Sequence, residues 1–159
     1  AMIDAGLPFD ELREALGRLP LDGFRVEVET TTRSSIQAKR FVVTLERHEH
    51  VHRGLSDIEA ILEHTDLPAP GLDAAARVFR SLAEAEARAH GIDVDRVHFH
   101  EVGAIDAIVD VVAGCFAVTR LGLERLYHSP LQLGHGFVDC AHGKMPIPAP
   151  GAILSLIHI

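Results

Sequence analysis

The stretch from 102 to 121 constrains the fold of this chain more than any other. Apolar side chains occupy nearly every side of the helix that its spacing predicts: Ile105, Ile108, Val109, Val111, Val112, Phe116 and Val118. A helix with this pattern lies in the interior of a protein, because each of its sides would otherwise expose apolar surface to water. We therefore predict a central, largely buried helix. Cys115 lies in the same pattern and is expected to pack as a small hydrophobic residue.

The rest of the pattern predicts a mixed α/β (α+β) fold, in which several helices pack against one small sheet. Apolar residues at helical spacing predict further helices over residues 8–19, 57–64 and 73–90. Strands are predicted at 24–28 and 36–45, joined as a hairpin through 30–35, and short extended segments at 94–99 and 126–127. Glycines and prolines indicate a break at 66–71 and an irregular loop over 131–150.

Two helices carry more detailed predictions. The helix over 57–64 is expected to begin at a capping box formed by Ser56 and Glu59. The helix over 73–90 is expected to turn six apolar residues inward and to end at Gly91. These six residues are Ala75, Val78, Phe79, Leu82, Ala85 and Ala89.

We expect residues 1–159 to form a single partial domain. The 159 residues, 47% of them hydrophobic, are sufficient for a core. The first six residues are typical of the end of a helix, whereas Leu154–Ile159 stop within an apolar pattern and are similar to a translated sequencing adapter. The chain is therefore expected to be a fragment, and Leu154–Ile159 are left out of the fold prediction.

Charge and composition argue against several classes of protein. The formal net charge of −8 argues against a nucleic-acid partner, since phosphate binding requires clustered lysine and arginine. We find no signal peptide, no apolar run of membrane-spanning length and no common nucleotide-binding or serine-hydrolase motif, so we expect a cytoplasmic protein without a membrane partner. The two cysteines form no disulfide framework. The eleven histidines stand out, because histidine is the commonest metal ligand.

The first group of candidate ligands surrounds the start of the buried helix. His98 and His100 are two apart in an extended segment and would point to the same side, and Glu101 follows directly. Asp106 and Asp110 are four apart and share one helix face. Together these groups can supply imidazole and carboxylate ligands, or ligands with a positioning acid. Alternatively, the acids form an exposed stripe favoured by the helix N-terminus, or Asp110 is buried beside a basic partner.

The second group is a run of alternating histidines. His48, His50 and His52 would present three imidazoles on one side of an extended segment. Imidazole suits nickel, zinc and copper, and a loop of this kind would serve metal capture or delivery. The alternative is a solvated polar loop without a ligand.

The third group lies among the glycines and prolines near the end of the chain. Cys140 and His142 can bind a soft or borderline metal, and Lys144 can meet an anion. Glycines there would let the backbone approach a ligand closely, or they merely shape a tight loop. The isolated histidines are expected to be structural: His64, His90 and His128.

Two long motifs in the expected order resemble the LarC family. The first is His98-Phe99-His100-Glu101-Val102-Gly103-Ala104, followed by Asp106 and Ile108-Val109-Asp110. The second is Leu133-Gly134-His135-Gly136, followed by Ala141-His142-Gly143 and Pro146-Ile147-Pro148-Ala149-Pro150. The helical segment Leu82-Ala83-Glu84-Ala85-Glu86-Ala87 is also similar, so that the resemblance covers about residues 2–150.

The resemblance implies a CTP-dependent nickel insertase, a cyclometallase of the lyase class. Such proteins place Ni²⁺ into pyridinium-3,5-bisthiocarboxylic acid mononucleotide, giving the nickel-pincer cofactor of lactate racemase and related enzymes. The reaction needs CTP with Mg²⁺ or Mn²⁺. Implied partners are the mononucleotide substrate and, as open alternatives, lactate racemase, other nickel-pincer enzymes and further copies of the chain.

The resemblance also suggests roles for individual residues. It implies nickel handling by the histidines at 48, 50, 52, 98 and 100, with Asp110 as a further candidate ligand. Formation of a carbon–nickel bond requires a base for the ring proton, for which Glu101 or Asp106 is a hypothesis. Cys140, His142 and Lys144 are candidates for cofactor binding.

Part of the family pattern is missing, and two other functions remain open. A glycine-rich turn that opens the family's pattern and the CTP-associated C-terminal region have no counterpart here, so we expect this chain alone to be inactive. One rival is a nickel carrier or storage protein without chemistry. The other is a metal-dependent hydrolase built on His98, His100 and Asp106, which would bind zinc tightly and keep an open coordination position for water.

Overall fold

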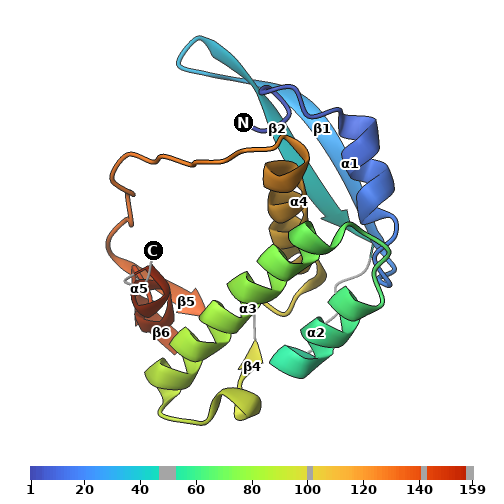
Figure 1. Cartoon of the computed structure of the whole chain (residues 1–159). Coiled ribbons are helices and arrows are strands. Elements are labelled where there is room, and N and C mark those ends of the chain that lie inside the picture. Colours follow the sequence, from blue (N-terminus) through green and yellow to red (C-terminus); the bar gives the residue numbers. More distant parts are fainter. Residues whose placement is uncertain (47–52, 100–101, 141–142, 157–159) are drawn as a thin grey trace.

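The computed structural model describes residues 1–46, 53–99, 102–140 and 143–156. In this part of the chain, helices and two-stranded antiparallel sheets form a mixed α+β fold (Figure 1). The helices are α1 (Phe9–Leu16), α2 (Leu55–Glu63), α3 (Ala69–His90), the 3₁₀ helix η1 (Val94–Arg96), α4 (Ile105–Arg120) and α5 (Pro150–Leu156). The strands are β1 (Phe24–Arg33), β2 (Ile36–Leu45), β3 (Arg53–Gly54), β4 (His98–Phe99), β5 (Phe137–Cys140) and β6 (Gly143–Pro146). The predicted fold class is confirmed, although the described strands form three separate pairs instead of one small sheet.

Helix α4 is the centre of the core, as its sequence predicts. It packs against α3, α1 and β2, and its buried residues are Ile105, Ile108, Val109, Val112, Ala113, Phe116 and Ala117. Burial of one large aliphatic side chain contributes about 1.5–3 kcal/mol, so this face supplies much of the driving force for folding. One side of α4 is nevertheless exposed, at Asp106, Asp110 and Gly114. The helix is therefore buried on most of its surface but not all round.

Cys115 lies half-buried at the margin of this core. Burial raises the pKa of its thiol, against a smaller opposing effect of the Arg77 charge. The thiol therefore stays protonated near neutral pH and packs as a hydrophobic group, as expected.

Helix α3 begins earlier than the sequence predicts. Pro68 precedes the first turn and Pro70 lies within it, where a missing backbone N–H has no intrahelical acceptor to lose. The helix ends at Gly91, whose φ of 65° is left-handed. Of the residues predicted to face inward, Ala75, Phe79 and Ala85 are buried and Leu82 is half-buried, whereas Val78 and Ala89 are exposed.

The start of α2 also differs from the prediction. Helix α2 begins at Leu55, and the Gly54 amide donates a hydrogen bond of 2.8 Å to Oδ2 of Asp57. The capping interaction is thus made by Asp57 with Gly54, and not by Ser56 with Glu59. Moving the cap two residues upstream places it at Gly54, the last residue of strand β3.

Strands β1 and β2 form a long hairpin that is paired from Phe24↔Leu45 to Arg33↔Ile36. The pairing continues through most of the stretch predicted as the connecting loop, and only Ser34 and Ser35 remain in the turn. Both have positive φ, 45° and 65°, as a two-residue hairpin turn requires. The far end of this hairpin projects from the body in Figure 1.

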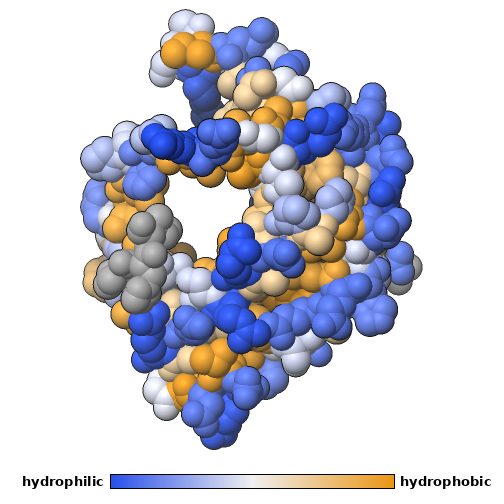
Figure 2. All heavy atoms as spheres, viewed as in Figure 1, coloured by the Kyte–Doolittle hydropathy of each residue, from blue (hydrophilic) through white to orange (hydrophobic). Residues whose placement is uncertain are grey.

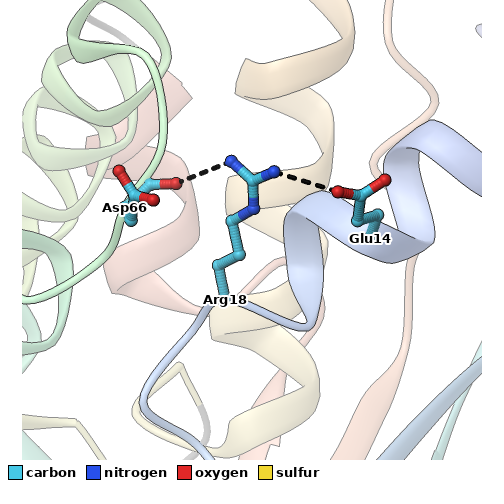
Figure 3. A network of polar contacts seen from close by, with 3 residues as sticks. All are labelled: Glu14, Arg18 and Asp66. Atoms are coloured by element: carbon cyan, nitrogen blue, oxygen red, sulfur yellow. Dashed lines mark hydrogen bonds and ion pairs between the residues drawn. The ribbon is translucent and has the colours of Figure 1, made fainter.

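A single arginine ties α1 to the loop between α2 and α3. Arg18 donates from Nη2 to Oε1 of Glu14 at 3.0 Å and from Nη1 to the carbonyl oxygen of Asp66 at 3.3 Å (Figure 3). These groups are exposed, so the contact positions the loop more than it stabilises the fold.

The C-terminal part departs most from the sequence prediction. Leu126 and Tyr127 are exposed and form no strand, whereas β5 and β6 make a hairpin where an irregular loop was predicted. Residues 154–156, which were left out of the fold prediction, belong to α5, and this helix packs against α3. No helix among the described residues is both long and apolar enough to cross a membrane.

Candidate metal site

Strand pair β3–β4 joins two segments that are distant in the sequence. Arg53 lies opposite Phe99, and Gly54 lies opposite His98, in antiparallel register. The Phe99 side chain is buried in the core, whereas His98 is exposed, as the alternation of side chains along a strand requires. The core thus fixes the backbone of β4 and leaves the His98 imidazole accessible from solvent.

The turn after β4 is held closely against β3. Nη1 of Arg53 donates a hydrogen bond of 2.8 Å to the carbonyl oxygen of Gly103. A Cβ atom added at Gly103 would lie 3.0 Å from the Phe99 carbonyl oxygen and 3.3 Å from Cβ of Arg53. Only glycine fits at this position without a shift of the backbone, so the close approach between β3, β4 and the start of α4 depends on it.

Two carboxylates follow this turn on one face of α4. Asp106 lies in the first turn, and its Oδ1 accepts a hydrogen bond of 2.9 Å from the Ala107 amide. Asp110 lies one turn further along the same face, and both residues are exposed. The structure therefore realises the exposed stripe that the sequence left open as an alternative, and not burial of Asp110 beside a basic partner.

Asp110 nevertheless lies in a distinctive environment. Partial burial of the carboxyl group and, to a smaller extent, the negative charge of Asp106 raise the pKa of Asp110 above its ordinary value. Its side chain lines a cavity of about 240 Å³ with mainly apolar walls, which include Met2 and Phe41. Lys39 lines the same cavity, and its Nζ donates to Oγ1 of Thr30 at 3.0 Å.

The third predicted group lies on the hairpin β5–β6. Cys140 ends β5 opposite Gly143, and Lys144 lies opposite Asp139. The Lys144 side chain is exposed, and its ammonium group lies 5.5 Å from the centre of the Phe137 ring, in a cation–π contact. The positive φ of Gly143, 85°, allows the tight reversal between the two strands.

The structure describes only some of the predicted site residues. His98, Asp106, Asp110 and Lys144 are placed as stated above, as is the backbone of Cys140. The others lie outside the described residues: His48, His50, His52, His100, Glu101 and His142. Within the described ranges, no three side chains of histidine, cysteine, aspartate or glutamate come together as a metal site. Four of the six predicted metal ligands thus lie outside the residues that the structure describes.

Two of the isolated histidines, His64 and His90, lie at helix C-termini as predicted, and the structural role expected of all three stays a prediction. His64 caps α2, with its Nδ1 2.7 Å from the Ala60 carbonyl oxygen, and His90 ends α3 with its Nε2 3.4 Å from Oε2 of Glu86. Nδ1 of His128 lies 2.8 Å from the carbonyl oxygen of Ser129. These contacts are local to each chain segment.

Arg53 is a residue that the sequence reasoning missed. It directly follows the alternating histidines, but its pairing with Phe99 is a long-range contact that no local pattern reports. Gly103 lies within the family motif, and its tight surroundings give a physical reason for glycine there.

Comparison with known proteins gives a consistent result. Residues 1–158 match the family described as nickel insertion protein. A relative from Roseiflexus castenholzii, provisionally named a nickel insertion protein, is 46% identical over 159 residues, which are all of this chain and 40% of the relative. A similarly named relative from Geotalea uraniireducens is 47% identical over 152 residues, 94% of this chain and 39% of the relative.

A third relative has a more specific name. The pyridinium-3,5-bisthiocarboxylic acid mononucleotide nickel insertion protein of Desulfitobacterium hafniense is 42% identical over 154 residues, 96% of this chain and 38% of the relative. The chain therefore spans about 40% of the length of the curated relatives that it matches. No solved structure matches it. The match over nearly the whole chain shows that this protein belongs to the nickel insertion protein family.

Proposed function

We propose that this chain is the nickel-handling part of a protein that inserts Ni²⁺ into pyridinium-3,5-bisthiocarboxylic acid mononucleotide. The family match and the name of the Desulfitobacterium hafniense relative support this substrate. The single observation that carries the proposal is the pairing of Arg53 with Phe99. Arg53 directly follows His52 in the sequence and Phe99 directly precedes His100, so this pairing supports a joint role for the two histidine motifs.

The donor types suit this ion. Imidazole is a favourable ligand for nickel, and His98 already lies exposed on the anchored strand. We propose that His48, His50 and His52 capture the ion and that His98 and His100 hold it for transfer, with Asp110 as a further ligand. The strand pair and the turn at Gly103 would keep the second set in place while the first exchanges its ion.

A base is needed where carbon–nickel bond formation displaces a ring proton. Asp106 is exposed at the start of α4, just after the anchored turn, and Glu101 lies closer in sequence to the histidines. We propose that one of these carboxylates accepts the proton from the pyridinium ring as the carbon–nickel bond forms. On the third motif, Cys140, His142 and Lys144 are proposed to contact the substrate, with the Lys144 ammonium facing one of its anionic groups.

The full-length family activity, a CTP-dependent cyclometallase reaction of the lyase class, is proposed for the whole protein and not for this chain alone. A triphosphate site needs several basic side chains close together. Three cavities lined by described residues each include a single basic side chain, from Arg80, Arg88 or Lys39. We therefore assign no residue of this chain to CTP or to its Mg²⁺ or Mn²⁺ ion.

Calorimetric titration of the tag-free chain with Ni²⁺ and Zn²⁺ in parallel tests the metal-handling role. We expect saturable nickel binding that weakens as the pH falls through the histidine range, because protonated imidazole cannot bind the metal. Tight zinc binding with little response to nickel would favour a hydrolase instead.

A second experiment separates insertion from mere storage. The full-length Roseiflexus castenholzii relative would be given Ni²⁺ and the mononucleotide, with and without CTP, and the product followed by mass spectrometry. We expect a nickel-containing product only with CTP. Nickel binding without any product under either condition would identify a carrier, and would overturn the proposed insertion.

A further inference from the structure

The segment that links α4 to β5 exposes a concentrated set of large apolar side chains. We call residues 123–135 the linking segment. The exposed fraction reaches 63% for Leu126 and 86% for Tyr127. Its exposed apolar residues are Leu123, Leu126, Tyr127, Leu131 and Leu133. Scattered single apolar residues are normal on a surface, but a cluster of this kind in one short stretch marks an interaction site.

The backbone of the linking segment has few hydrogen-bond partners, and the contact of His128 Nδ1 with the Ser129 carbonyl oxygen lies within the segment itself. Among the described residues, none forms a backbone–backbone hydrogen bond with residues 124–135. In Figure 1 the segment runs as an open orange trace away from α4 before it reaches β5, and Figure 2 shows an opening between this trace and the body. A structureless connection of this length is uncommon within a compact fold.

The sequence of the segment suits a strand at the edge of a sheet. Leu131 and Leu133 are two apart, so an extended backbone places both on one face and Gln132 on the other. Pro130 has no N–H to donate, which a strand tolerates at an edge and not between two neighbours. Paired in this way, the free N–H and C=O groups would gain partners and the two leucines would be covered.

We propose that residues 126–133 pair as a β-strand with a strand from the part of the full-length protein outside these 159 residues. The partner strand is assigned to the same polypeptide because of the length of the full protein. The chain covers 40% of the Roseiflexus castenholzii relative, so most residues of that protein lie outside the match. A strand in the same polypeptide is held at high effective concentration, so it would pair in preference to a strand from another molecule. The linking segment is then an internal docking surface, and it is independent of the proposed nickel chemistry.

Hydrogen exchange followed by mass spectrometry tests this pairing in the full-length Roseiflexus castenholzii relative and in this 159-residue chain. We expect amides that match residues 124–135 to exchange on the order of 100-fold more slowly in the full-length protein. The exposed hairpin turn at Ser34 and Ser35 is the internal control and should exchange quickly in both. Equal exchange of the linking segment in the two proteins would overturn the proposal. Protection in the short chain that rises with its concentration would do the same, because it would identify a second copy as the occupant.

Two variants of the 159-residue chain test whether the leucines of the linking segment pack within this chain. Leu131→Asp combined with Leu133→Asp should change the melting temperature little, because the two residues are 53% and 44% exposed within these 159 residues. Ile36→Asp at the hairpin end, where the side chain is 71% exposed, is the matched control. A lower melting temperature for the double variant alone would show that the leucines pack within this chain, against the proposal.

Discussion

Arg53 lies opposite Phe99 in the pair β3–β4, and its guanidinium also donates to the carbonyl oxygen of Gly103 beyond that strand. Arg53 therefore pairs with strand β4 through its backbone and contacts the turn into α4 through its side chain. This arrangement connects the family sequence motif to the core, because Phe99 is buried while His98 is exposed beside it.

Replacement of Arg53 by methionine should destabilise this junction. Methionine keeps an aliphatic side chain of similar length but loses the charged donor to the partly buried carbonyl of Gly103, at a cost of about 1–2 kcal/mol. Nickel affinity should fall as well if the junction positions the histidines. Urea denaturation and nickel titration measure the two effects. Arg33→Met at the exposed end of β1 is the control, and equal losses for both variants would show that the Gly103 contact contributes nothing.

Two glycine-to-alanine substitutions should change the free energy of unfolding in opposite directions. At Gly103 the new Cβ would lie 3.0 Å from the Phe99 carbonyl oxygen, so Gly103→Ala should lower the free energy of unfolding by about 1–3 kcal/mol. At Gly114, inside α4, nothing lies within 4 Å of the new Cβ, and alanine should stabilise the helix by about 0.5–1 kcal/mol. Thermal unfolding of both variants measures the difference. A Gly103→Ala variant as stable as the wild type would show that the turn is loosely packed.

A core substitution and an exposed neighbour on α3 test the helix register. Phe79 is fully buried, and Phe79→Ala should lower the free energy of unfolding by about 3–5 kcal/mol, through lost transfer energy and the cavity left behind. Val78 is the adjacent residue and is 38% exposed, so Val78→Ala should cost much less. Chemical denaturation gives both values. Comparable losses in the free energy of unfolding would mean that α3 turns a different face toward α4.

The elements that the sequence predicts well are those with long, regular patterns. The apolar run of α4 and the inward positions Ala75 and Phe79 of α3 are confirmed, because burial follows directly from helical spacing. Pro70 misled the prediction of the α3 start, since a proline that breaks a helix interior is tolerated in its first turn. The hairpin β5–β6 was missed because its glycines and prolines resemble an irregular loop.

The family could be predicted from the sequence motifs, whereas the geometry around the candidate site could not. The histidine and acid motifs can be read from residue types and spacing, and they led to the correct family. The pairing of Arg53 with Phe99 could not be predicted from the sequence, because strand pairing between distant segments leaves no local signal. The exposure of Asp106 and Asp110 also depends on which side of α4 the other elements cover, which spacing alone does not determine.

Loss of the central histidines should weaken nickel binding without unfolding the chain. His98 is exposed, so His98→Ala combined with His100→Ala should leave the circular dichroism spectrum unchanged while nickel affinity falls by at least roughly tenfold. His64→Ala is the matched control, because that imidazole lies near the Ala60 carbonyl oxygen at the end of α2, away from the motif. Unchanged nickel affinity in the folded double variant would make the central motif structural.

The raised pKa of Asp110 gives the metal-free chain a defined pH dependence. The folded state binds this proton more tightly than the unfolded state, so the stabilisation from Asp110 is complete below the ordinary aspartate pKa. It is lost as the pH rises through the raised folded value. Asp110→Asn mimics the protonated form and should therefore be more stable than the wild type at pH 7 and equal to it near pH 3. Because the residue is exposed and its carboxyl group is only partly buried, we expect the gain at pH 7 to stay below about 1 kcal/mol.

Denaturation curves of Asp110→Asn at several pH values, with a chelator present, measure this effect. Asp22→Asn, at an exposed loop position, should follow the wild type at every pH. Asp106→Asn should lower the Asp110 pKa, as seen in an NMR titration of the carboxyl group, because it removes the second cause of the shift. A wild type that is more stable than Asp110→Asn at pH 7 would contradict the expected gain in the free energy of unfolding. It would show that the Asp110 carboxylate is held by a favourable contact instead of opposed by its surroundings.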